Sequence, residues 1–383
     1  MTTTWQALSA LALASVVTGV GAVPAAAKTF VFVSAAQDGV IDVYAMSTAD
    51  GALTAVRKVQ AGKLVMPMAV SPNRQFLYAA VRSEPFKVLT YAIDPATGDL
   101  TQRASAPLPD SMPYVSTDAT GRFLFTASYG GDKVAVSKIN ENGLVEAEAI
   151  QVLPTGRNAH AIRTDHTNRF VYVPNLGTDQ ILQFRFDEKT GKLMPNEPAA
   201  VKARAGHGPR HFVISPDNRN LYVLGELSGH VAQFALDQAT GTLKEIDSVA
   251  SVPPESNLAP GVPQPPVGAS AAPGPDVRRI WAADLQMTPN GKYLYATERN
   301  SSRIALLTVA PDSGKLAYMR NFMTEKQPRG IKIDPAGNYL VAAGEKSDRL
   351  AVYKINQVTG ELTEVAHAPV GNGANWVEMV ELP

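Results

Sequence analysis

Short apolar runs alternate with polar turns along most of the chain. In the segment that begins at Gly208, an apolar run at 212–214 leads into Ser-Pro-Asp-Asn at 215–218, and a second apolar run follows at 221–224. Proline presets φ in a turn, and Asp and Asn side chains bond to their own backbone. The flanking runs are rich in residues that favour strands. This pattern predicts a strand, a tight turn and a second strand.

The same pattern recurs along the chain. Its turns begin at Ser71, Thr117, Thr164, Ser215, Thr288 and Asp334. Most intervals between them are about 46 to 51 residues, the length expected of a four-stranded propeller blade. Each pattern is followed by an alternating third strand, a turn with glycine, and a more polar fourth strand suited to an outer edge. The sequence therefore predicts six complete four-stranded units.

A seventh unit is divided between the two ends of the chain. Segments 29–33, 40–45 and 53–60 match the second, third and fourth strands, and segment 373–382 matches the missing first strand. Pairing the two ends would close the ring and leave no open sheet edge at the seam. We therefore predict an all-β, seven-bladed β-propeller over residues 28–383, with four antiparallel strands per blade.

Two segments depart from the repeat. Residues 252–278 contain too many prolines for a sheet ladder and predict a long loop between blades. The apolar run 8–23, followed by Ala25-Ala26-Ala27, predicts a signal peptide over residues 1–27 that is cleaved after Ala27. The mature protein would then be periplasmic or secreted. The start of the chain lacks Lys and Arg, so an uncleaved anchor, a mis-assigned start and a cytoplasmic location stay open as alternatives.

Charge and cysteine content narrow the function classes. Lys and Arg number 35, as do Asp and Glu, so no basic excess indicates nucleic acid or an anionic membrane surface. The chain has no cysteine, which excludes disulfides and thiol chemistry. No further membrane span is expected in the mature chain.

Blade geometry predicts that chemically capable side chains collect on one face of the ring. The turns between first and second strands belong to one face, whereas the starts of first strands and the ends of second strands belong to the other. A concave site with convergent polar groups is the default binding-site hypothesis. The second face is expected to carry Asn158, His160, Arg210, His211, Glu226, Arg278, Arg279, Trp281, Asp284, Glu298, Arg299, Arg329, Glu345, Lys346, Asn375 and Trp376.

Three short motifs at these positions resemble those of a known family. They are Gly208-Pro-Arg-His211, Trp281-Ala-Ala-Asp284 and Gln327-Pro-Arg-Gly330. From about Phe30 to the C-terminus, the chain resembles the seven-bladed β-propeller lactonase family, which includes propeller-type 6-phosphogluconolactonase and carboxymuconate-type lactonising enzymes. The resemblance implies a hydrolase acting on a sugar lactone in carbohydrate metabolism.

The resemblance also implies a catalytic trio of His160, Arg210 and Glu226. One departure is Gly225, where the phosphogluconolactonase-like pattern has Asn. Another is the predicted export, because sugar phosphates are chiefly cytoplasmic; a non-phosphorylated lactone would suit a periplasmic enzyme better.

Lactone hydrolysis needs a base for the attacking water and donors for the oxyanion. The chain has no Gly-x-Ser-x-Gly motif and no cysteine, so we expect direct attack by water rather than an acyl-enzyme. Either His160 or Glu226 could be the base. Arg210 would bind a substrate carboxylate or the oxyanion, since a guanidinium is always charged and fork-shaped.

The remaining candidates are assigned to substrate binding: His211, Arg279, Trp281, Asp284, Arg329 and Lys346. Several of these could instead form a structural ring with Glu345 and Glu298. No cofactor and no metal are expected. Glu226, Asn175 and Asp284 lack compact ligand spacing, and the neighbouring arginines disfavour a cation.

Two other functions stay open at this point. One is a non-catalytic propeller that binds a partner or a small anion in the cell envelope, because propeller architecture alone fixes no function. The other is a carboxymuconate-type lactonising enzyme. The expected partner is a small-molecule lactone, with no nucleic acid, and the protein could be a monomer or a dimer.

Overall fold

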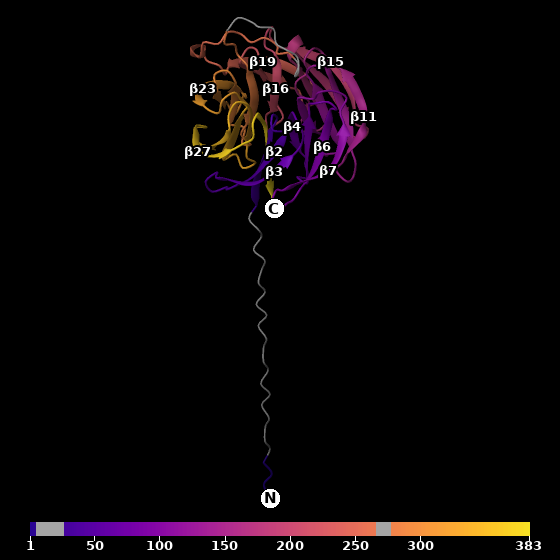
Figure 1. The fold of residues 1–383 in the computed structure, drawn as a ribbon, viewed down its shortest axis with the longest axis vertical. Helices are drawn as coiled ribbons and strands as arrows, with labels where there is room; N and C mark the ends of the chain where they lie inside the picture. The colour runs from indigo at the N-terminus through magenta and orange to yellow at the C-terminus, as the bar shows by residue number, and fades with distance from the viewer. Residues whose placement is uncertain (5–26, 266–276) are drawn as a thin grey trace.

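The computed structural model describes residues 1–4, 27–265 and 277–383 of the chain. These residues form seven antiparallel sheets of four strands each, arranged in a ring. In Figure 1 the colour passes in sequence order around the ring, with β4 and β16 near the centre and β7, β11, β15, β19, β23 and β27 towards the rim. The predicted seven-bladed β-propeller is confirmed.

Each blade runs outwards from a first strand at the central channel to a fourth strand at the rim. Blades 1 to 3 contain β28 (Ala374–Leu382), β1 (Lys28–Ala35), β2 (Val40–Met46) and β3 (Leu53–Gln60); β4 (Val65–Val70), β5 (Phe76–Val81), β6 (Lys87–Ile93) and β7 (Leu100–Pro107); and β8 (Tyr114–Thr117), β9 (Phe123–Ser128), β10 (Lys133–Ile139) and β11 (Val145–Pro154). Blades 4 and 5 contain β12 (Arg163–Thr164), β13 (Phe170–Asn175), β14 (Gln180–Asp187) and β15 (Lys192–Lys202); and β16 (Pro209–Ile214), β17 (Asn220–Gly225), β18 (His230–Leu236) and β19 (Leu243–Ala250). Blades 6 and 7 contain β20 (Ala282–Met287), β21 (Tyr293–Glu298), β22 (Arg303–Val309) and β23 (Leu316–Met323); and β24 (Pro328–Ile333), β25 (Tyr339–Gly344), β26 (Arg349–Ile355) and β27 (Leu362–Pro369).

Blade 1 joins the two ends of the described chain. β28 pairs antiparallel with β1, and Phe30 lies opposite Val380 and Val33 opposite Val377. The first strand of this blade therefore comes from the C-terminus and the other three from the N-terminal region, as the divided repeat predicted. The ring is therefore closed by a ladder of paired strands rather than by loop contacts alone.

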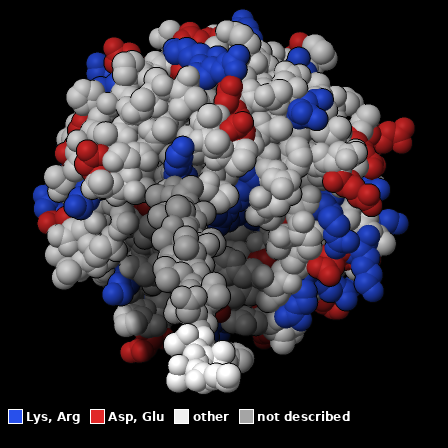
Figure 2. All heavy atoms as spheres, turned by 90° about the horizontal axis from the view of Figure 1, so that it is seen from below, with Lys and Arg blue, Asp and Glu red and all other residues white. Residues whose placement is uncertain are grey.

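Burial follows the order of the strands within a blade. Every residue of β13 and β25 is buried, whereas most residues of β3 are exposed. The apolar core therefore lies in layers between neighbouring sheets, and the polar fourth strands form the rim. On the face seen in Figure 2, acidic and basic side chains are interspersed, consistent with the zero net charge.

The face that carries the turns between first and second strands is called here the turn face. Asn218 takes a left-handed φ of 59° at its turn, as do Asn168 (59°) and Gly121 (72°) at equivalent places. Asn and Gly tolerate this conformation best. The repeated turn chemistry identified in the sequence therefore serves the backbone conformation of these turns.

Two sequence predictions lie partly or wholly outside the described residues. Residues 5–26 fall in the predicted signal peptide, so export and a periplasmic or secreted location stay predictions. The described part of the 252–278 segment contains the 3-10 helix η2 (Pro254–Ser256), and its Ala259 forms an isolated bridge with Arg279, just beyond the segment. A second 3-10 helix, η1 (Leu176–Thr178), follows β13. Within the described ranges, no helix is long and apolar enough to cross a membrane.

Candidate active site

Two positions of the repeat supply most of the polar side chains at one end of the channel. One is the second residue of a first strand, which is Arg210 in β16 and Arg329 in β24. The other is the residue directly after a second strand. In blades 2, 3, 5, 6 and 7 that residue is Arg82, Tyr129, Glu226, Arg299 and Glu345, respectively. This end of the channel is called here the site face.

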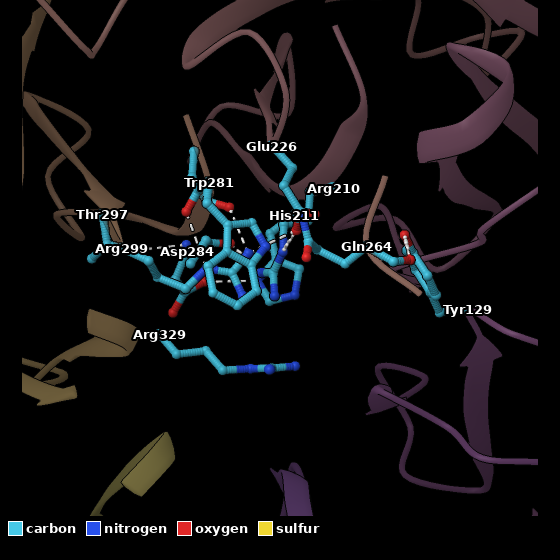
Figure 3. Close-up of polar contacts among 12 residues, drawn as sticks. Tyr129, Arg210, His211, Glu226, Gln264, Trp281, Asp284, Thr297, Arg299 and Arg329 are labelled. Carbon is cyan, nitrogen blue, oxygen red and sulfur yellow. Dashed lines mark hydrogen bonds and ion pairs between the residues drawn. The ribbon is translucent and has the colours of Figure 1, made fainter. Parts of the chain in front are cut away.

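Glu226 holds two arginines from neighbouring blades. Its Oε2 accepts a hydrogen bond from Arg210 Nε at 2.7 Å and from Arg299 Nη2 at 2.9 Å (Figure 3). Arg210 Nη1 also donates to the carbonyl of Ala283. All three charged residues are at most 3% exposed. This arrangement is a charge-assisted network, in which each bond is stronger than a neutral one.

Arg299 is fixed on every side. Its Nε donates to the carbonyl of Trp281 at 3.0 Å, and Nη2 also donates to the carbonyl of Ala282 at 3.1 Å. Its guanidinium carbon lies 3.7 Å from the centroid of the Trp281 ring, a cation–π contact. Burial lowers the pKa of Arg299 to about 9, although Glu226 opposes the shift. Trp281 therefore supports a charged residue.

A second polar group lies beside this network. His211 Nδ1 and Asp284 Oδ1 are 2.9 Å apart, and Asp284 also accepts hydrogen bonds from the backbone N–H groups of Leu285 and Ile331. Burial raises the pKa of Asp284, but the His211 contact and these N–H groups outweigh it and keep the pKa below its usual value. An ionised carboxylate only accepts hydrogen bonds, so His211 Nδ1 carries the proton.

His160 packs against His211. The ring centroids are 5.3 Å apart with an interplanar angle of 72°, and Tyr129 covers the other side of His160 at 5.6 Å. Burial, followed by the charges of Arg210 and neighbouring His211, lowers the pKa of His160 well below 6.5. Burial and Arg210 likewise lower the pKa of His211 to about 4. Both imidazoles are therefore neutral at pH 7.

Each of these imidazoles has a buried nitrogen without a partner. His160 Nδ1 and His211 Nε2 make no hydrogen bond to any described residue, and neither does Asn175 Oδ1. Asn175 lies close to His160 in space, because the His160 N–H donates at 3.0 Å to the carbonyl of Pro174, the residue before Asn175. Buried polar atoms in native proteins are nearly always paired with protein or water. These open atoms mark where water or substrate can bind.

Arg329 and Glu345 form a further pair on blade 7. Arg329 Nη1 donates to Glu345 Oε1 at 3.0 Å. Burial raises the pKa of Glu345, but the nearby arginines, Arg329 first, outweigh it and lower the pKa. In Figure 3, Arg329 extends beneath the His211 group with its guanidinium directed towards the centre. The sequence left two roles open for Arg329, substrate binding and pairing in a structural ring. The ion pair with Glu345 corresponds to the second.

The channel contains a cavity on the turn-face side of His211 and Asp284. This cavity of about 450 Å³ is lined by His211, Asp284, Tyr114 and Trp376, and it reaches the turn-face residues Pro216 and Pro289. Arg210 and Glu226 do not line it. The His211–Asp284 pair therefore lies between the Arg210–Glu226 network and this turn-face cavity.

The structure separates the predicted site residues into two groups. Arg210 contacts Glu226, His160 contacts His211, and His211 contacts Asp284, so these five form one cluster with Arg329 nearby. Two other predicted binders make no such contact among the described residues. Arg279 donates to the carbonyl of Pro260 in the long loop, and Lys346 is exposed at the blade 7 surface.

Three residues of the site face were not assigned from the sequence. Arg82 and Tyr129 were not considered, and Arg299 was placed on this face without a role. All three occupy the repeat position of Glu226, directly after a second strand. Aligning the repeats by that position would have identified them.

No group of three His, Asp or Glu side chains suited to a metal ion occurs among the residues that the structure describes. Glu226 and Asp284, two of the oxygen ligands considered from the sequence, are already engaged by arginines and by His211, respectively.

The fold and site together define a propeller with a buried cluster of His, Arg, Glu and Asp side chains at one end of its channel. The chain belongs to the seven-bladed β-propeller lactonase family, whose description "Lactonase, 7-bladed beta-propeller" it matches over residues 30–379. The predicted enzyme class, a lactonase among the carboxylic-ester hydrolases, is thereby confirmed.

Individual relatives agree with this assignment. The chain is 37% identical to a 6-phosphogluconolactonase of Pectobacterium carotovorum over 352 residues, which cover 92% of this chain and 98% of the relative. It is 38% identical to one of Erwinia tasmaniensis over 333 residues, covering 87% and 93%. The structure of a periplasmic gluconolactonase of Pseudomonas aeruginosa superposes with a TM-score of 0.80 at 22% identity, covering 94% of this chain and all of that one. At this identity, the superposition demonstrates the common fold.

Proposed function

We propose that this protein hydrolyses a sugar lactone at the site face by direct attack of an activated water. The observation that carries the proposal is the buried, unpartnered Nδ1 of His160, which lies in the same cluster as the Arg210–Glu226 pair. A lactone carbonyl needs a base for water and a cation for the oxyanion. This cluster contains both.

His160 is the better candidate for the base. Glu226 Oε2 already accepts two guanidinium hydrogen bonds, and protonation of this carboxylate would remove the negative charge that both arginines share. His160 is neutral, and its Nδ1 has no competing partner among the described residues. We therefore assign the base to His160 and the anchoring of Arg210 to Glu226.

Arg210 supplies the positive charge for the reacting carbonyl. Its Nε and Nη1 are held by Glu226 and Ala283, and its Nη2 donates to no described residue. A cation fixed before the reaction stabilises developing negative charge without reorganisation. The tight anchoring of Arg210 is what such preorganisation requires.

Replacing His160 tests this assignment. In H160A, kcat for glucono-1,5-lactone, corrected for spontaneous hydrolysis, is expected to fall by about 10²- to 10⁴-fold, the usual contribution of a general base. H166A is a matched control, because His166 is an exposed imidazole at the turn face. Full activity in folded H160A would contradict the proposal.

The dependence of kcat/KM on pH gives a second test of His160 as the base. Because burial lowers the pKa of His160 well below 6.5, the neutral form persists as the pH falls through 6.5. In the wild-type protein, kcat/KM should therefore stay level from pH 7 to below pH 6.5 and decline only at lower pH. A decline centred at or above pH 6.5 would argue against His160 as the base.

A further inference from the structure

Arg82 is a buried guanidinium without a carboxylate partner. It follows β5, and only 6% of its surface is exposed. Its Nε donates to Ser111 Oγ at 3.1 Å and its Nη1 contacts Met66 Sδ at 3.3 Å. No Asp or Glu among the described residues lies within ion-pair distance of it, and its Nη2 donates to none of them. A thioether sulfur is a weak acceptor, so much of this cation's hydrogen-bonding capacity is unused.

The other arginines at the two repeat positions of the site face are paired. Arg210 and Arg299 share Glu226, and Arg329 is bound to Glu345. Asp284 adds a negative charge beside the neutral His211. Together with Arg82, these arginines supply four guanidinium groups, which the carboxylates of Glu226, Glu345 and Asp284 leave with one positive charge over. The residue without an ion pair is Arg82.

The surroundings of Arg82 disfavour its charge. Burial lowers its pKa to about 9, and the charges of Arg329 and Arg210 push in the same direction, against the weaker pull of Glu345 and Asp110. Asp110 is bound to Lys133 at 2.9 Å. A buried charge is costly unless it is paired. An arrangement that crowds cations and leaves one unpaired is stabilised when an anion binds.

We infer that Arg82 binds an anionic group of the substrate, a phosphate or a carboxylate remote from the lactone carbonyl. This assignment rests on the proposed function, because it places the reacting carbonyl at His160 and Arg210. The fork-shaped guanidinium suits two oxygens of one anionic group. Arg82 would then set the preference for charged over neutral sugar lactones.

The two anionic groups have different consequences for the location of the enzyme. A phosphorylated lactone suits a cytoplasmic enzyme, whereas a carboxylated lactone suits the predicted export as well as the unpaired charge. The same guanidinium chemistry serves both. The choice between them therefore falls to experiment.

Kinetics with three lactones test the inference. The full-length protein and the R82M variant are assayed with glucono-1,5-lactone, its 6-phosphate and glucaro-1,4-lactone, each corrected for spontaneous hydrolysis. R82M should reduce the preference for one of the anionic lactones over the neutral one, expressed as a ratio of kcat/KM, by about 10- to 100-fold, the range of a charge-assisted hydrogen bond. The loss should be mainly in KM. The anionic lactone whose preference falls identifies the group that Arg82 binds.

Two further variants separate binding from folding. R185M removes an exposed guanidinium from β14 and should leave the preference as it is. R82K keeps the charge but not the fork, and it should fall between the wild type and R82M. An equal loss on all three lactones, or an unchanged preference in R82M and R82K, would overturn the inference.

A binding measurement keeps this test independent of the proposed function. Inorganic phosphate should raise the melting temperature of the wild-type protein, and this effect should be lost in R82M or weakened in R82K. If the wild type hydrolyses none of the three lactones but phosphate stabilises it through Arg82, the proposed function fails and the anion site stands. If phosphate has the same effect on the wild type and the Arg82 variants, the anion site fails for phosphate, and the glucaro-1,4-lactone kinetics decide it for carboxylate.

Discussion

The two faces of the ring use similar polar residues in opposite ways. On the turn face, Asp165 accepts hydrogen bonds from the Thr167 hydroxyl, from the backbone of 167, 169 and 170, and from Asn218 of the next blade. Asp118 accepts the same set one blade earlier, including one from Asn168. These two carboxylates therefore have their hydrogen-bond partners within the protein.

On the site face, the polar groups are buried as deeply but are not fully paired. His160 Nδ1, His211 Nε2 and Asn175 Oδ1 have no described partner, and Arg82 has no carboxylate. A fully satisfied polar network stabilises one structure, whereas a partly satisfied one costs free energy. At the two ends of the channel, incomplete pairing therefore distinguishes the proposed ligand site from the turn networks of Asp118 and Asp165.

The largest effect is expected at Glu226, which pairs with two arginines of the site face. In E226A, two buried guanidinium groups lose their common partner, so the free energy of unfolding should fall by about 3–5 kcal/mol. Activity should also fall by more than about 100-fold, because Arg210 loses its anchor. Urea unfolding and lactonase assays measure the two effects.

E226Q is the matched control for this change. Its amide oxygen can still accept a hydrogen bond from Arg210, so it should keep more stability than E226A. If E226A retained both stability and activity, Glu226 would not be the anchor of this network.

The fold could be predicted from the sequence because its information is local. Each repeat contains the residues that form its own strands and turns. The fourth strand predicted at 53–60, for example, coincides with β3. The closure strand, predicted over 373–382, begins one residue later as β28. Even the long-range pairing of the two ends could be read from the one repeat that lacked a strand.

The site was only partly predictable because ion pairing is not local. Arg279 and Arg299 belong to the same blade and look equally suitable in the sequence. Arg299 follows β21 directly and points to Glu226, whereas Arg279 lies before β20 and bonds to Pro260. The position of an arginine relative to the strand ends thus decides whether it enters the channel, and the motif alone does not reveal its partner.

A moderate effect is expected when the turn face is broken. In D165A, Asn218 Nδ2 and several backbone N–H groups lose their acceptor, which should lower the free energy of unfolding by about 1–3 kcal/mol. Activity should stay within about twofold, because Asp165 belongs to a turn network. A large loss of kcat at unchanged stability would remove the distinction between the faces.

The acid dependence of D165A sharpens this test. Burial raises the pKa of Asp165, but hydrogen bonds from Thr167 and Asn218 outweigh it, and the pKa is lowered below 3.8. A lowered carboxyl pKa contributes stability above the unfolded-state value that is lost as the pH falls through the folded-state value. The difference in stability between the wild type and D165A should therefore shrink below pH 3.8.

The smallest effect is expected at Lys346. It was predicted to bind substrate, but it is exposed, and its side chain makes no ion pair or hydrogen bond with the described residues. K346A should change kcat/KM by less than about threefold for neutral and anionic lactones alike, since isolated exposed charges contribute little. It lies next to Glu345, which holds Arg329, so it tests whether proximity to the site face is enough for a role. If K346A reduced kcat/KM as much as R82M does, an exposed charge would matter as much as a buried unpaired one. A buried polar group without a partner would then no longer identify the residues that bind the ligand.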